Sequence, residues 1–137
     1  MYDLSDQFEI SAYPQNAGAA RERVLQAATR AGFAGMDLAD IEISVGEAVT
    51  NAILYGSPKP SCLVVLSFGP TNAGFVIQVR DEGTGFDPSL VQTEEDTDAL
   101  GGRGIRLMRA LMDEVDLHYD GHGMTAILIK KLPSHSG

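Results

Sequence analysis

The sequence is poor in cysteine, in long apolar runs and in basic residues. Cys62 is the only cysteine, so no internal disulfide can form, which suits a reducing compartment. It lies within the apolar run 62–66, which favours a small core side chain over a reactive thiol. The three histidines have no second cysteine to join, so the ligand set of a structural zinc site is missing.

No apolar run approaches the roughly 20 residues that are needed to span a bilayer. Residues 1–6 contain neither a basic n-region nor an apolar h-region, so we expect no signal peptide. The sequence therefore predicts a cytoplasmic protein that does not act at a membrane.

Lysine and arginine number 10 against 19 aspartates and glutamates, which gives a net charge of −9. A general nucleic-acid binder needs a basic surface, so we expect no direct nucleic-acid partner. A nucleotide is not excluded, because backbone N–H groups and a divalent cation hold its phosphates locally. No Gly-Lys-Ser/Thr occurs, and the glycines at 101–104 follow an acidic loop rather than a strand, so a P-loop and a Rossmann site are both disfavoured.

The length of 137 residues and the 44% of hydrophobic residues are typical of one soluble globular domain, which we assign to residues 1–137. Alternation and apolar runs predict strands over 8–13, 62–68, 75–80, 115–119 and 124–131. Helical spacing predicts helices over about 16–31 and 38–55, and a third marked by Ile105, Met108, Leu111, Met112 and Val115. The expected fold is an α+β two-layer sandwich, in which a mostly antiparallel mixed sheet carries three helices on one face.

Short polar segments predict where these elements begin and end. Asn16 and Asp37 are suited to cap the first and second helices, and residues 69–74 are predicted as a hairpin turn. Few large apolar residues occur between Asp81 and about residue 102, and a loop of this length inside a compact domain indicates a functional lid, here at about 84–101. The lid contains acidic residues but no lysine or arginine before Arg103.

The second helix carries a polar stripe beside its apolar one, formed by Asp40, Ser44, Glu47 and Asn51. Glu47 and Asn51 are four residues apart, so their side chains lie on the same face one turn from each other. A solvated helix face is one interpretation. A ligand set is the other, because asparagine is a poor helix-interior residue, a carboxamide oxygen suits Mg²⁺, and a carboxylate can act as a base.

Two glycine clusters follow along the chain. Asp81 ends a strand and is followed by Gly83 and Gly85, whose missing side chains would let the backbone approach a planar ligand. Asp81 would then be placed to accept a hydrogen bond from a ring amine. The second cluster, 101–104, opens the third helix, where unpaired N–H groups form a phosphate site and Arg103 adds charge. Taken singly, the first cluster could equally be an acidic turn and the second a flexible hinge.

The order of these motifs resembles the ATP-binding domains of the GHKL group, which includes gyrase B and the histidine kinases. The order is Glu47 with Asn51, then Asp81 with its glycines, a lid, the glycines 102–104, and Thr125 in the last hairpin. Within this group, the segments 44–53 and 112–115 resemble the anti-sigma-factor serine kinases of bacteria, and the likeness covers nearly the whole chain.

The resemblance implies that the chain binds ATP with Mg²⁺ and that each motif has a role. Asn51 would ligate Mg²⁺, Glu47 would be the general base, and Asp81, helped by Thr125, would hold the adenine amine. Gly83 and Gly85 would make room for the base and ribose. The residues implied to contact ATP are Asn51, Asp81, Gly83, Gly85, Gly102, Arg103, Gly104 and Thr125.

The resemblance also implies two protein partners: an anti-sigma-factor antagonist phosphorylated on serine or threonine, and a sigma factor. Relatives are often homodimers, and the sequence leaves this open. Two other functions remain: an ATP-binding partner-switching module without phosphotransfer, and a detached histidine-kinase catalytic domain. A histidine-kinase domain is disfavoured, because such kinases phosphorylate a histidine on a separate helical domain. All three histidines lie after residue 117, and none lies on a predicted helix before the ATP motifs.

Overall fold

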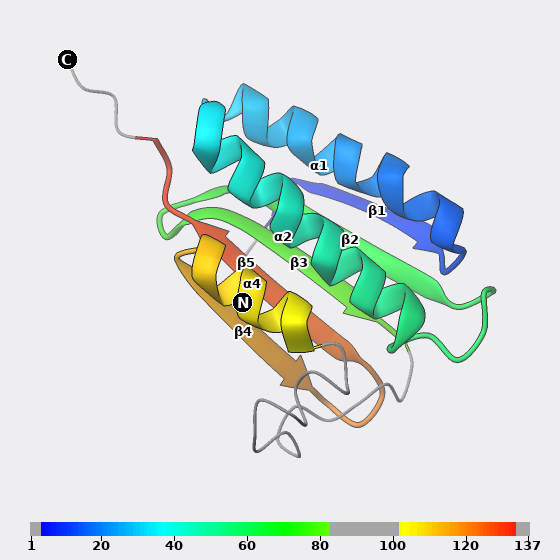
Figure 1. Ribbon diagram of the computed structural model, residues 1–137. Helices are drawn as coiled ribbons and strands as arrows, with labels where there is room; N and C mark the ends of the chain where they lie inside the picture. The colour runs from blue at the N-terminus through cyan, green and yellow to red at the C-terminus, as the bar shows by residue number, and fades with distance from the viewer. Residues whose placement is uncertain (1–3, 83–101, 134–137) are drawn as a thin grey trace.

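The computed structural model describes residues 4–82 and 102–133. Its five strands form one sheet in the order β1-β2-β3-β5-β4, and each pair of neighbours is antiparallel. Figure 1 shows the helices α1, α2 and α4 on one face of this sheet, which confirms the expected α+β two-layer sandwich. The elements are β1 (Asp6–Ser11), η1 (Pro14–Asn16), α1 (Ala17–Arg30), α2 (Gly35–Leu54), β2 (Leu63–Thr71), β3 (Gly74–Asp81), α4 (Gly102–Leu111), β4 (Glu114–Tyr119) and β5 (Met124–Lys130).

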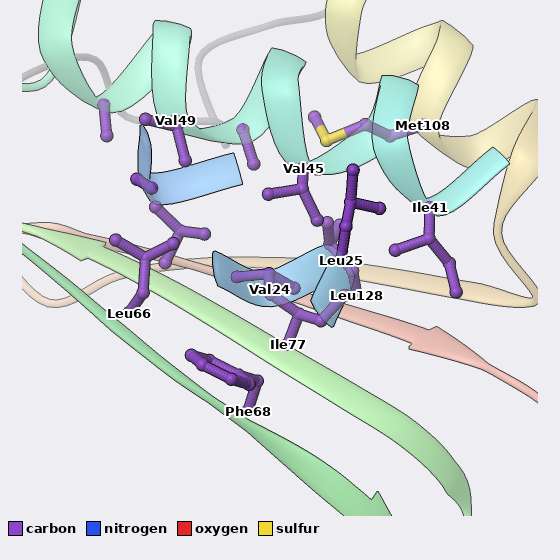
Figure 2. Close-up of a cluster of buried hydrophobic side chains, with 14 of the residues drawn as sticks. Val24, Leu25, Ile41, Val45, Val49, Leu66, Phe68, Ile77, Met108 and Leu128 are labelled. Carbon is purple, nitrogen blue, oxygen red and sulfur yellow. The ribbon is translucent and has the colours of Figure 1, made fainter. Parts of the chain in front are cut away.

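The core lies between the helices and the sheet. Alternate residues of a strand point to the same face, so every second side chain of β2, β3 and β5 meets the helices. Figure 2 shows this contact, with labelled side chains from both layers: Val24, Leu25, Ile41, Val45, Val49, Leu66, Phe68, Ile77, Met108 and Leu128. Burying each such side chain is worth about 1.5–3 kcal/mol relative to exposure, which fixes α2 and α4 over the sheet. Among the described residues, no helix has the length and apolarity needed to cross a membrane.

Two helix starts differ from the sequence prediction. Asn16 closes the short 3-10 helix, and its side-chain amide donates a hydrogen bond to the Ser11 carbonyl at 3.0 Å instead of capping α1. Helix α2 begins at Gly35, so Asp37 lies in its first turn and is not the cap. An acidic residue there is still favourable, because the helix dipole is positive at its N-terminus.

The predicted turn over 69–74 is mostly strand. Pro70 pairs with Phe75 across the β2–β3 ladder, and only residues 72–73 lie outside it. Proline is tolerated there because the pairing of β1 ends at Phe68, so β2 has no hydrogen-bonded neighbour on that side beyond it.

Lys130 links three elements from a nearly buried position at the end of β5. Its side chain is 11% exposed, and its Nζ donates to Asp40 Oδ2 on α2 at 3.0 Å and to the Leu111 carbonyl at the end of α4 at 2.6 Å. A lysine suits this place because the last carbonyls of a helix lack intrahelical partners. Lys130 therefore ties the N-terminal part of α2 and the C-terminal end of α4 to the sheet.

We expect Lys130→Ala to lower the free energy of unfolding by about 2–4 kcal/mol, because it leaves the Asp40 carboxylate and the Leu111 carbonyl without their shared donor. The neighbouring Lys131 is exposed, so Lys131→Ala should change this free energy by no more than about 0.5 kcal/mol. Urea denaturation of the two variants measures both effects. Equal midpoints would show that the buried lysine contributes nothing to stability.

Candidate functional site

A pocket that is partly open to solvent lies between α2, α4 and the ends of the central strands. Of the described residues that line it, most are apolar and two are polar, Asn51 and Asp81. Such a pocket is typical of a small-molecule site, in which apolar surface supplies contact and a few polar groups fix orientation. The lining residues are Ala48, Asn51, Ala52, Gly56, Val79, Asp81, Ile105, Met108, Leu117, Met124 and Ala126.

Asp81 is the last residue of β3 and is only 3% exposed. Its Oδ1 accepts a hydrogen bond from the backbone N–H of Met124 at 3.1 Å. Two glycines make room for it: a side chain at Gly56 would overlap its carboxylate, and one at Gly123 would overlap its backbone carbonyl. The carboxylate is therefore fixed at the pocket wall by Gly56, which follows α2, and by the start of β5, and the sequence pattern did not reveal these contacts with Asp81.

Glu47 and Asn51 lie one turn apart on α2, and both side chains are half-buried. Gly104, in the first turn of α4, packs directly against them. A Cβ built on Gly104 would lie 2.6 Å from Glu47 Oε2 and 3.4 Å from Asn51 Nδ2, so only glycine fits without a shift. The N-terminus of α4, whose first N–H groups lack intrahelical partners, therefore meets the acid and the amide.

The Asn51 side chain has no hydrogen-bond partner among residues 4–82 and 102–133, although it lines the pocket. A buried core amide would normally be paired. The Asn51 amide is therefore not a paired structural amide, and it fits both interpretations of the polar stripe, a ligand set and a solvated helix face. The stripe's fully buried Ser44 likewise has an unpartnered hydroxyl within the described part of the chain.

Glu47 does not line the apolar pocket but borders an open groove on the outer side of α2. The groove is lined by Arg21, Glu42, Ile43, Gly46, Glu47 and Thr50. Arg21 of α1 crosses above the α2 backbone, and a Cβ built on Gly46 would be 3.5 Å from its Cδ. The Glu47 carboxylate thus lies between a solvent-facing groove and the first turn of α4.

Thr125 lies in the last hairpin, as predicted, but its hydroxyl does not point toward Asp81. Its hydroxyl accepts a hydrogen bond from Arg80 Nη1 at 3.0 Å, and the two residues pair across β3 and β5 on the sheet face that points away from the helices. The residue that reaches Asp81 is Met124, one position earlier, through its backbone N–H. Because strand side chains alternate, this offset of one residue moves the hydroxyl to the opposite face.

Several predicted residues fall outside the described part of the structure. Gly83, Gly85 and the predicted lid at 84–101 all do. Gly102 begins α4 and Arg103 follows it, but the Arg103 side chain is not described. Among the described residues, no group of three acidic, histidine or cysteine side chains could hold a metal ion alone. A single amide such as Asn51 fits a Mg²⁺ ion that takes its other ligands from water and phosphate.

Comparison with known proteins shows the family of the chain. Residues 10–130 match the model of the histidine kinase-like ATPase domain family. The chain is 27% identical over 132 residues to the serine-protein kinase RsbW of Listeria innocua, covering 89% of this chain and 83% of that protein. It is 33% identical over 132 residues to the serine-protein kinase RsbW of Bacillus licheniformis, covering 88% of this chain and 81% of that protein.

Solved structures show the same fold. A crystal structure of the RsbU and RsbW domains of a Mycobacterium tuberculosis protein aligns with a TM-score of 0.66 at 20% identity, covering 93% of this chain and 33% of that one. The histidine kinase domain of a blue-light activated kinase from Erythrobacter litoralis aligns with a TM-score of 0.56 at 22% identity, covering 85% of this chain and 61% of that one. The chain thus spans only part of each of these structures.

Proposed function

Because the chain belongs to the histidine kinase-like ATPase family, with serine-protein kinases named RsbW among its relatives, we propose that it is an ATP-dependent protein serine/threonine kinase and anti-sigma factor. It would act in the cytoplasm, phosphorylate a small antagonist protein and sequester a sigma factor, and so regulate transcription without contacting nucleic acid. The observation that carries the proposal is one pocket with Asp81 and Asn51 in its wall and with Gly104 and Glu47 packed together beside it.

The proposed orientation of ATP follows from the chemistry of the pocket wall. The adenine ring would lie among the apolar side chains and donate its exocyclic amine to Asp81. The phosphates would extend toward Asn51 and the N-terminus of α4, where helix N–H groups and a positive dipole end favour anions. Mg²⁺ on the Asn51 amide oxygen would offset the charge of the triphosphate. Gly83 and Gly85 would face the base and ribose, and Gly102, Arg103 and Gly104 would close over the phosphates.

In the proposed reaction, a serine Oγ of the antagonist attacks the γ-phosphorus of ATP. The Oγ–P bond forms, the bond from the γ-phosphorus to the bridging oxygen breaks, and ADP leaves. Glu47 takes the hydroxyl proton, and the α4 N-terminus with Arg103 balances negative charge on the transferred group. No lysine or arginine occurs in the predicted lid at 84–101, so these groups, with the charge that a bound Mg²⁺ would supply, would balance the negative charge.

The groove beside Glu47 is the proposed approach for the protein substrate. It opens to solvent, and Glu47 is part of its lining together with Arg21 of α1. Arg21 lies along it and could bind an acidic group of a partner, whereas Ile43, which is 42% exposed, offers an apolar contact. A hydroxyl that enters this groove would meet Glu47 before it meets the apolar pocket.

We expect Mg-ATP and Mg-ADP to raise the melting temperature of the protein. Ligand at about 100 times its dissociation constant should add about 2.7 kcal/mol of stability by mass action. Mg-GTP should stabilise less, because guanine places a carbonyl where adenine has its amine, and a carboxylate repels it. A melting curve that millimolar Mg-ATP and Mg-ADP both leave unchanged would contradict the proposal at its root.

The kinase activity itself is tested by incubation with radiolabelled ATP and the antagonist encoded nearest the gene. The proposal expects label on a serine or threonine that survives acid treatment. Label on histidine, which acid removes, would favour the histidine-kinase alternative. A protein that binds ATP but labels no antagonist would instead be the partner-switching module without phosphotransfer.

A further inference from the structure

The β4–β5 turn lies directly against the residue proposed to bind adenine. Gly123 is the last residue of this turn, and its main chain packs on the backbone carbonyl of Asp81 so closely that a side chain there would overlap it. The next residue, Met124, donates its N–H to Asp81 Oδ1 at 3.1 Å. The direction of the Asp81 carboxylate therefore depends on where the turn holds these two residues.

Asp120 holds the turn from within. Its Oδ1 accepts the backbone N–H of His122 at 2.8 Å and that of Gly123 at 2.9 Å. Gly121, between them, has a φ of +87°, a conformation that glycine adopts without strain. One carboxylate oxygen thus fixes the two successive N–H groups that immediately precede Met124.

Arg80 anchors the same carboxylate to β3. Its Nη2 donates to Asp120 Oδ2 at 2.9 Å, while its Nη1 donates to the Thr125 hydroxyl at 3.0 Å. Arg80 precedes Asp81 in the strand, so the two side chains point to opposite faces of the sheet. Strand β3 therefore holds the β4–β5 turn from both faces, with Arg80 on the outside and Asp81 inside the pocket.

The charge on Asp120 is maintained by the same contacts. The N–H of His122, together with that of Gly123 and the Arg80 guanidinium, lowers the pKa of the Asp120 carboxyl to about 2. Like any ordinary aspartate, it is ionised at neutral pH, and the three donors extend the ionised range to lower pH. A carboxylate with backbone N–H and guanidinium donors makes stronger hydrogen bonds than a neutral acceptor.

We propose that Asp120 is a positioning residue for base recognition, which fixes the β4–β5 turn so that the Asp81 carboxylate is aimed at the exocyclic amine of a purine. Asp120 does not line the pocket and acts through Gly123 and Met124. The inference rests on the proposed binding of ATP at this pocket. It assigns base selectivity to a residue of the β4–β5 turn that does not touch the ligand.

The test compares the dissociation constants of Mg-ATP and Mg-ITP, which differ at the group that Asp81 would meet: ATP carries an amine there and ITP a carbonyl. We expect the wild-type protein to prefer ATP and Asp120→Ala to reduce the ITP-to-ATP ratio of dissociation constants about fivefold or more, as expected for one misaligned hydrogen bond. Asp120→Asn keeps an oxygen that can accept both N–H groups, so it should retain most of the preference. Titration calorimetry measures all the constants.

Asp116→Ala is the matched control, because Asp116 is an exposed aspartate on β4 that lies outside the turn. It should leave the ratio unchanged. If Asp120→Ala weakens ATP and ITP equally, the role of Asp120 is merely structural and the proposal is overturned. Should Asp120→Ala not fold, Arg80→Met replaces it; a ratio lowered at least twofold there supports the proposal, and an unchanged ratio overturns it. A wild-type protein that binds neither nucleotide contradicts the proposed function itself, and this shows before any variant is compared.

Discussion

Glu47→Gln is expected to retain Mg-ATP affinity and to lose phosphoryl transfer to a protein serine by about 10²-fold or more. A serine hydroxyl has a pKa far above neutrality, so its attack on phosphorus needs a base within hydrogen-bond reach. Glu47 is one helical turn from Asn51, packs against Gly104 and borders the open groove, which places it beside the proposed phosphate site and away from Asp81. The substitution keeps the size of the side chain and removes its basicity.

Glu42→Gln is the matched control for this variant. Glu42 lies on the same helix and lines the same groove, but only Glu47 also contacts Gly104. We expect Glu42→Gln to alter at most the KM for the antagonist and to leave kcat unchanged, as measured with radiolabelled ATP at saturating antagonist. If Glu47→Gln transfers phosphate at the wild-type rate, Glu47 is not the base. If both variants lose the same activity, the groove serves docking alone.

Much of the fold could be predicted because its signals are local. Strand alternation and the spacing of apolar residues along the helices are read within single segments, and the structure confirms the two-layer sandwich that they imply. The predicted hairpin between β2 and β3 is confirmed, but its turn is limited to residues 72–73, and the prediction of 69–74 was too long because Gly69 and Pro70 are common turn residues. Whether Pro70 is tolerated in a strand depends on where the pairing of β1 ends, which is a property of the sheet and not of the segment.

In the candidate site, too, contacts within one segment could be predicted and contacts between distant segments could not. Glu47 and Asn51 could be paired from sequence because a spacing of four residues is enough to put two side chains on one helix face. Gly56, Gly123 and the Met124 N–H were missed as neighbours of Asp81, since each contact joins residues distant in sequence. The structure brings Glu47 and Asn51 together with Gly104. The roles of these three residues toward ATP stay predictions.

The assignment of Thr125 shows how a small error in register matters. A threonine in the last hairpin was expected to assist Asp81, but an offset of one residue on a strand reverses the face of every side chain. Position 124 faces the pocket and carries methionine, whereas the Thr125 hydroxyl binds Arg80 on the opposite face. The sequence names the residue types near the site, but only the β3–β5 register decides which of two neighbours reaches it.

Asn51→Ala should abolish the Mg²⁺-dependent gain in nucleotide affinity and change the stability of the ligand-free protein little. Truncating a hydrogen-bonded buried amide leaves its partners unpaired and costs about 1–3 kcal/mol, but the Asn51 side chain has no hydrogen-bond partner among the described residues. Removing the amide should therefore lower the affinity for nucleotide only when the metal and phosphates are present. We expect the affinity for ATP with Mg²⁺ to fall at least about tenfold, toward the value measured with EDTA, as for a lost charge-assisted contact.

Asn16→Ala provides the opposite control, since the Asn16 amide is bonded to the Ser11 carbonyl and does not line the pocket. It should lower the melting temperature of the ligand-free protein and leave the Mg²⁺-dependent gain intact. Thermal melts with and without nucleotide, each with Mg²⁺ or EDTA, separate the two patterns. If Asn51→Ala is destabilised in every condition and still gains affinity from Mg²⁺, its amide is a structural group, and the metal must be held elsewhere in the chain.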